Sequence, residues 1–210
     1  MVPFLFVLLA LSFPVASQDP LDAALASYTK VASYRVTLRS RSDFSSEIIR
    51  YFYKKPGFVR MEFIEPHKGA SLVYNPETKQ AKLRPFGFMN SLSLYLSPEN
   101  PLIISARGHR VDASDIGALL EAARMLRANG QSKVMGSVVT GGRRTVLVAI
   151  EGEGNVTVGG NIHRCLLWLD AKTFLPVRTT TYDSSGALLE DVTLNDLDIN
   201  LSLPDSLFAQ

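Results

Sequence analysis

The sequence predicts an α+β fold, in which one large antiparallel sheet carries helices on one face. The stretch from Tyr51 to Tyr74 reads as three strands, because turns at Lys55-Pro56-Gly57 and at Pro66 to Gly69 interrupt its alternating apolar pattern. Roughly ten strand-like segments stand against only two helical ones. No repeat, linker or second domain is found, so we expect a single domain.

Two segments have the spacing of amphipathic helices. The first begins at Asp19-Pro20, an N-cap followed by proline at the first helical position, and extends to about Val31. The second covers Asp112 to Asn129, with acidic residues in its first turn and Gly130 as its stop. Its apolar residues fall on one face: Ile116, Leu119, Leu120, Ala123 and Leu126.

The other predicted strands follow from apolar residues that alternate with polar ones. They are Ser33–Arg39, Ser45–Lys54, Gln80–Phe86, Leu92–Leu96, Val134–Val139, Thr145–Ile150, His163–Asp170, Phe174–Tyr182 and Ala187–Asn200. Thr140 to Arg143 is the turn of a hairpin, and Leu203 to Phe208 is expected to dock on the body in an extended form. The apolar loop Phe86 to Met89 lies either under the sheet or at the mouth of a cavity.

Composition excludes some classes of protein. The 210 residues are 46% hydrophobic and 20% charged, which is typical of a folded domain rather than a disordered chain. The formal charge of +2 is too weak on its own to argue for nucleic-acid binding. Cys165 is the only cysteine, so neither an internal disulfide nor a lipid-accepting cysteine after the apolar start is expected.

The first 17 residues read as a secretory signal peptide, an apolar run that ends in small residues. Its cleavage would leave residues 18–210 as the mature domain. No Lys or Arg precedes Lys30, so an uncleaved anchor or a start codon placed too early remains an alternative. We expect an exported, periplasmic protein that is soluble and not lipidated.

Sequence motifs for catalysis and metal binding are absent. His163 and Cys165 share a strand face and are the one nucleophile–base pair that the sequence contains. We expect Cys165 to be a buried, unreactive thiol instead. The pairs Glu151/Glu153 and Asp196/Asp198 suit solvated faces. Gly141 to Arg144 offers a phosphate or lipid headgroup contact or, more simply, a hairpin tip. We expect no enzyme, no metal and no cofactor.

The remaining signal is an excess of apolar side chains. Two amphipathic helices are too few to fill the concave face of one large sheet, so an apolar groove is expected there, with plain core packing as the alternative for each residue. The candidate lining residues are Val36, Leu38, Val59, Met61, Phe63, Phe86, Phe88, Met89, Leu94, Leu119, Leu120 and Trp168.

Several short motifs resemble the LolA-like superfamily of periplasmic outer-membrane lipoprotein carriers, which includes lipid-binding mycobacterial lipoproteins and RseB/MucB-type sensor domains. They are Ser33 to Leu38, Lys54 to Met61, Ser71 to Tyr74, Leu167 to Asp170, Leu175 to Arg178 and Asp205 to Phe208. The resemblance implies an incomplete β-barrel whose apolar cavity is covered by helices. It also implies a lid, for which the helix Asp112 to Asn129 is the candidate. Lys55 stands where the carriers have the arginine that fastens the lid, and a lysine lacks its planar fork.

Two functions follow from this resemblance. The first is a carrier or binder of lipid or lipoprotein acyl chains, which serves as a monomer and exchanges cargo with a membrane donor or receptor. The second is a sensor or scaffold of the cell envelope on the same half-barrel, with the cavity filled by its own side chains. An open apolar cavity would favour the first function, and a fully packed interior the second.

Overall fold

The computed structural model describes residues 18–43, 45–85, 92–153 and 161–209. The predicted signal peptide, residues 1–17, lies outside these ranges, as do Phe86, Phe88 and Met89 of the predicted cavity lining. None of the helices in the described part is long and apolar enough to cross a membrane.

One antiparallel sheet of eleven strands dominates the described chain, in the order β6-β5-β4-β3-β2-β1-β11-β10-β9-β8-β7. The strands are β1 (Ser33–Arg41), β2 (Ser46–Lys54), β3 (Phe58–Glu65), β4 (Ser71–Asn75), β5 (Gln80–Arg84), β6 (Leu94–Leu96), β7 (Gly130–Thr140), β8 (Arg143–Gly152), β9 (Arg164–Asp170), β10 (Pro176–Tyr182) and β11 (Leu188–Ile199). The first and last strands, β1 and β11, pair in the middle of the sheet, while β6 and β7 are its edges. The sheet is therefore not closed into a barrel, and the predicted α+β class is confirmed.

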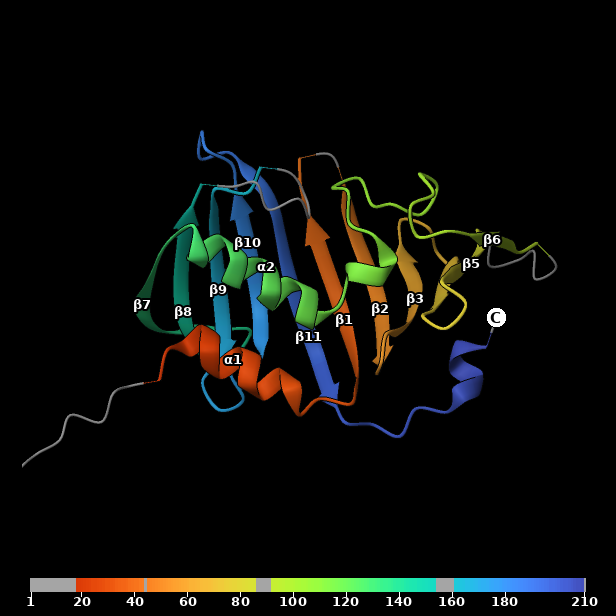
Figure 1. The fold of residues 1–210 in the computed structure, drawn as a ribbon, viewed down its shortest axis with the longest axis horizontal. Helices are drawn as coiled ribbons and strands as arrows, with labels where there is room; N and C mark the ends of the chain where they lie inside the picture. The colour runs from red at the N-terminus through yellow and green to blue at the C-terminus, as the bar shows by residue number, and fades with distance from the viewer. Residues whose placement is uncertain (1–17, 44, 86–91, 154–160, 210) are drawn as a thin grey trace, which may run out of the picture.

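Both helices lie on the same face of the sheet (Figure 1). In α1 (Pro20–Thr29), the Asp19 carboxylate accepts hydrogen bonds from the backbone N–H groups of Leu21 and Asp22 at 2.9 and 3.2 Å. The second helix, α2 (Ile116–Ala128), begins later than predicted. Asp115 rather than Asp112 is its N-cap, because residues 111–113 form a separate 3₁₀ turn, η1 (Val111–Ala113).

The main core lies between the sheet and the helices. Its buried residues include Leu21, Val59, Leu120, Ile150 and Leu167. A smaller cluster around Phe52, Val73 and Phe208 forms where the C-terminal segment folds into η2 (Asp205–Phe208). The docking of this segment was predicted correctly. Its backbone is extended at Pro204, as predicted, but forms a 3₁₀ turn from Asp205 to Phe208.

Candidate functional site

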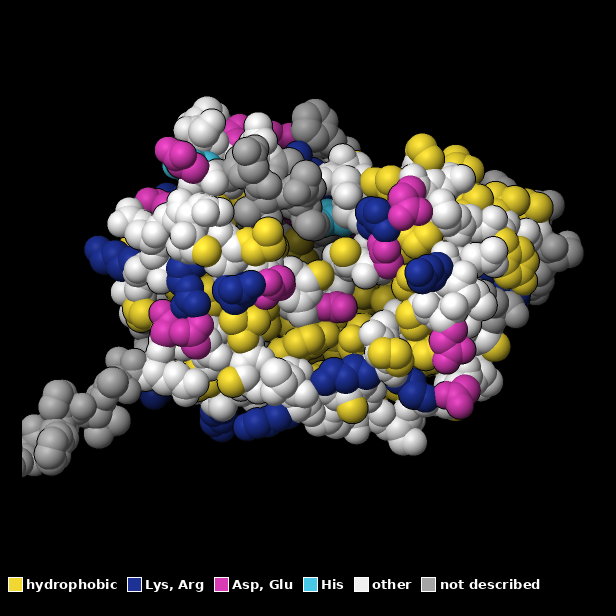
Figure 2. Space-filling model, in the orientation of Figure 1, with side chains coloured by type: hydrophobic (Ala, Val, Ile, Leu, Met, Phe, Trp, Pro, Cys, Tyr) yellow, Lys and Arg dark blue, Asp and Glu magenta, His cyan; other side chains and the backbone are white. Residues whose placement is uncertain are grey.

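A cavity of about 960 Å³ lies between the helix side of the sheet, α2 and the segment from Leu102 to Asp115. This volume is near the upper end of the range for small-molecule sites. Figure 2 shows hydrophobic side chains exposed at the bottom of a hollow on this face. The interior is therefore not filled by the side chains of the described residues.

Strand alternation gives the cavity a gradient of polarity. Successive inward residues are Tyr34, Val36, Leu38 and Ser40 on β1, Tyr51, Ile49 and Glu47 on β2, and Leu194, Val192 and Glu190 on β11. The register pairs Leu38 with both Ile49 and Leu194, and Ser40 with Glu47. At about 3.3 Å per residue, the row from Tyr34 to Ser40 is roughly 20 Å long. The cavity thus passes from aromatic through aliphatic to carboxylate side chains.

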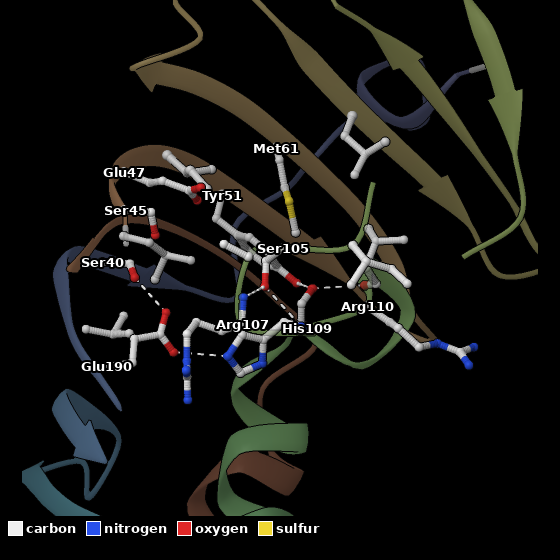
Figure 3. Close-up of a pocket in the computed structure, with 18 of the residues that line it drawn as sticks. Ser40, Ser45, Glu47, Tyr51, Met61, Ser105, Arg107, His109, Arg110 and Glu190 are labelled. Carbon is white, nitrogen blue, oxygen red and sulfur yellow. Dashed lines mark hydrogen bonds and ion pairs between the residues drawn. The ribbon is translucent and has the colours of Figure 1, made fainter. Parts of the chain in front are cut away.

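The polar end is built around Glu190. Ser40 Oγ donates to Glu190 Oε1 at 2.6 Å, and His109 Nε2 lies 3.0 Å from Glu190 Oε2 (Figure 3). The Glu190 side chain is only 16% exposed. Burial raises its pKa, but the hydrogen bond and charge of His109, the Ser40 hydroxyl and the charge of Arg107 together outweigh burial and lower it. Glu190 therefore holds the segment around His109 against β1 and β11.

This cluster does not have the order of a serine hydrolase triad. A triad places the imidazole between hydroxyl and carboxylate, whereas here Glu190 lies between Ser40 and His109. The other nearby hydroxyl, Ser105 Oγ, accepts the backbone N–H groups of Arg107 and His109 at 3.3 and 3.0 Å. Its role is to shape the turn that presents His109.

Cys165 has the character expected of an inert thiol. It is 4% exposed, and burial raises the pKa of its thiol to about 11, although a contact with Thr179 Oγ1 at 3.6 Å opposes this. His163, its predicted base, lies just before β9 and is exposed. Across the described residues, no group of three or more His, Cys, Asp or Glu side chains could hold a metal ion.

The predicted lining residues divide into three groups. Val36, Leu38, Met61, Phe63 and Leu119 line the cavity, whereas Val59 and Leu120 are buried in the core beside it. Leu94 lies on the edge strand β6 and is 36% exposed. Trp168 is also away from the cavity, because Cys165, Leu167 and Leu169 are the buried, inward residues of β9. The Trp168 ring is instead covered by the Arg178 guanidinium, 4.7 Å from the ring centroid.

Lys55 fastens a different helix from the one that the resemblance implies. Its Nζ donates to the carbonyl oxygen of Thr29, the last residue of α1, at 2.8 Å. The start of α2 is held by two tyrosines from the sheet. Tyr34 Oη accepts the N–H of Ile116 at 3.1 Å, and Tyr51 Oη lies 3.0 Å from Ser114 Oγ.

Toward its other end, α2 is joined to α1 by Arg127. The guanidinium of Arg127 pairs with Asp19 at 2.9 Å and with Asp22 at 2.6 Å. Arg127 therefore links the two helices to each other, while Lys55 anchors α1 and the two tyrosines anchor α2.

The pairing of Glu190 predicts acid-sensitive stability. Because the folded pKa of Glu190 lies below its ordinary value, the stabilisation is present above an ordinary carboxyl pKa of about 4.3 and is lost as pH falls through the folded pKa. We expect Glu190→Gln to lower the free energy of unfolding by about 1–3 kcal/mol at neutral pH. Urea unfolding should show this difference shrinking on acidification. A pH-independent difference, or an equal effect of the surface change Glu77→Gln, would contradict the assignment.

Comparison with known proteins identifies a family to which the chain is matched and several solved structures with a similar fold. A family model described as "Protein of unknown function (DUF1571)" matches residues 29–210. No curated protein matches.

Three solved structures have similar folds. An uncharacterised conserved protein from Thermus thermophilus has 12% identity and a TM-score of 0.56, with 92% of this chain and 93% of that chain covered. MucB in the Pseudomonas aeruginosa MucA/MucB complex has 18% identity and a TM-score of 0.55, with coverage of 91% and 60%. The Mycobacterium tuberculosis lipoprotein LppX has 10% identity and a TM-score of 0.52, with coverage of 88% and 95%.

These similarities are at the level of the fold. The predicted resemblance is confirmed as a likeness of fold to the MucB and LppX structures. The chain spans only 60% of the length of the matched MucB chain, so it corresponds to part of that protein.

Proposed function

The chain belongs to the family described as "Protein of unknown function (DUF1571)", and from this premise we propose that it is a periplasmic protein that binds or carries the acyl chains of a lipid or lipoprotein. The open cavity of about 960 Å³ is the observation that carries the proposal. Its middle is walled by aliphatic side chains from β1, β2 and β11 on one side and by Leu119 and Ala122 of α2 on the other.

Burial of an acyl chain in the cavity would provide affinity without any covalent reaction. Each methylene buried is worth about 0.8 kcal/mol, so an acyl chain laid along the apolar rows would supply most of the affinity. Glu190 lies between the Ser40 hydroxyl and the His109 imidazole, which is not the order of a catalytic triad. This arrangement supports a role in binding and positioning rather than in catalysis. We therefore propose a protein with no enzyme activity, whose mature domain, residues 18–210, acts as a monomer after removal of the leader.

A second candidate function is a sensor or scaffold that binds a protein partner. The edge strand β7 favours it, since Val134, Met135 and Val139 are 50%, 51% and 76% exposed. One similar fold, that of MucB, is recorded in complex with MucA. The two candidates differ in whether the cavity holds a ligand.

Native mass spectrometry tests the carrier proposal. The protein would be purified from its own periplasm without detergent, and the bound material would then be extracted with solvent. We expect a co-purifying lipid or acylated peptide. A clean apoprotein mass that also fails to shift on addition of lipid would overturn the proposal and leave the sensor or scaffold function. The start of the purified chain would test the leader prediction.

A further inference from the structure

The polar end of the cavity contains two carboxylates in different states. Glu47 on β2 and Glu190 on β11 flank Ser40 of the intervening β1, and Figure 3 shows all three at the same end. Both oxygens of Glu190 are engaged, one by Ser40 and the other by His109. In the part of the chain that the structure describes, the Glu47 carboxylate takes part in no hydrogen bond or ion pair. Glu47 is therefore, of these two carboxylates, the one whose oxygens have no partner among the described residues.

Glu47 lies in surroundings that disfavour its own charge. Its side chain is half-buried in the cavity wall. Burial and the negative charge of Glu190 raise the pKa of Glu47, and the positive influence of His67 and His109 only partly opposes them. An added cation with N–H donors would offset both unfavourable effects, whereas an added anion would intensify the second.

Among the described residues, no cationic side chain forms an ion pair with Glu47, although the charges of His67 and His109 act on it. Arg107 acts electrostatically on Glu190, and His109 is bonded to the same carboxylate. The Arg110 side chain points away from Glu47 and Glu190 (Figure 3). It pairs instead with Glu99 and Asp112. The head of a ligand that lies on the apolar rows would therefore reach an end of the cavity where the Glu47 carboxylate is unpaired among the described residues.

We propose that the ligand is an amphiphile with a primary ammonium head group, which donates hydrogen bonds to Glu47 while its hydrocarbon chain lies along the apolar rows of β1, β2 and β11. This inference rests on the proposed function, because it names the class of ligand that the same cavity takes. It adds a preference for the charge and the donors of the head group, which acyl-chain burial alone does not provide.

Isothermal titration with matched amphiphiles tests the proposal on the delipidated protein at neutral pH. The probes are decylamine, decyltrimethylammonium, decanol and decanoate, which share one chain and differ in the head group. We expect decylamine to bind at least about tenfold more tightly than decanol, because a hydrogen bond to a charged group is worth about 1.5–3 kcal/mol. Decanoate should bind most weakly. Decyltrimethylammonium, which has the charge without donors, should bind more weakly than decylamine.

The variant Glu47→Gln keeps the shape of the side chain and removes its charge. We expect it to abolish the preference for decylamine over decanol. Glu77→Gln, an exposed change of the same type in the turn between β4 and β5, should retain the preference. Binding of decanol and decylamine with equal affinity, or a preference that survives Glu47→Gln, would overturn this inference and leave the proposed function standing. Failure of every probe to bind would overturn both.

Discussion

Replacing Leu119 with aspartate should weaken the binding of decanol by at least about 100-fold, because a carboxylate in an apolar cavity has to be desolvated or protonated. Leu119 is half-buried and faces the cavity from α2, whereas its neighbour Leu120 is completely buried in the core. The change therefore alters the wall without removing a core side chain. A neutral probe is needed, since an ammonium head would be attracted by the new carboxylate.

Met125 supplies the matched control on the same helix. Its side chain is 47% exposed and does not line the cavity, so Met125→Asp introduces the same charge on α2 without touching the site. We expect decanol affinity to be unchanged in this variant. Unchanged affinity in a folded Leu119→Asp protein would instead show that α2 is not a wall of the binding site, and would count against its predicted role as a lid.

The sequence predicts local structure well where a period is clear. Alternation identifies the strands, and the apolar face of the second helix includes both Leu119 and Leu120. Leu119 lines the cavity and Leu120 is buried in the core. Which of the two packs against the sheet depends on how the helix is placed on it, and helical spacing does not specify that placement. The outward position of Trp168 was accessible from the sequence, because Cys165, Leu167 and Leu169 occupy the alternate positions of the same strand.

The polar end of the cavity was missed for a different reason. Glu47 shares a strand face with Ile49 and Tyr51, a relation readable from the sequence, but its neighbour Glu190 is more than 140 residues away. Only the pairing of β1 with β11 brings Ser40 and Glu190 together. The segment that presents His109 has no regular period, so the pattern gave no signal for its place across the cavity.

The largest expected loss of stability follows from Gly152→Ala at the end of β8. Gly152 allows the last turn of α2 to touch the strand backbone directly, because an added Cβ would overlap the carbonyl oxygen of Leu126 and lie 3.1 Å from its Cδ1. A backbone carbonyl at the end of a helix has little freedom to move, so either α2 or β8 must shift. We expect the free energy of unfolding to fall by about 3 kcal/mol or more.

Gly57→Ala separates this steric effect from the general effect of replacing glycine. A Cβ at Gly57 would lie 3.5 Å from Pro76 Cβ, an ordinary van der Waals contact, so its effect on urea unfolding should stay within about 1 kcal/mol. If Gly152→Ala lowered the free energy of unfolding by as little as Gly57→Ala, it would contradict the close packing of α2 on β8 described above. Since Leu119 and Leu126 lie on the same helix, a shift at Gly152 should also weaken decanol binding. That coupling would link the helix position to the shape of the cavity, which Gly57→Ala should leave unchanged.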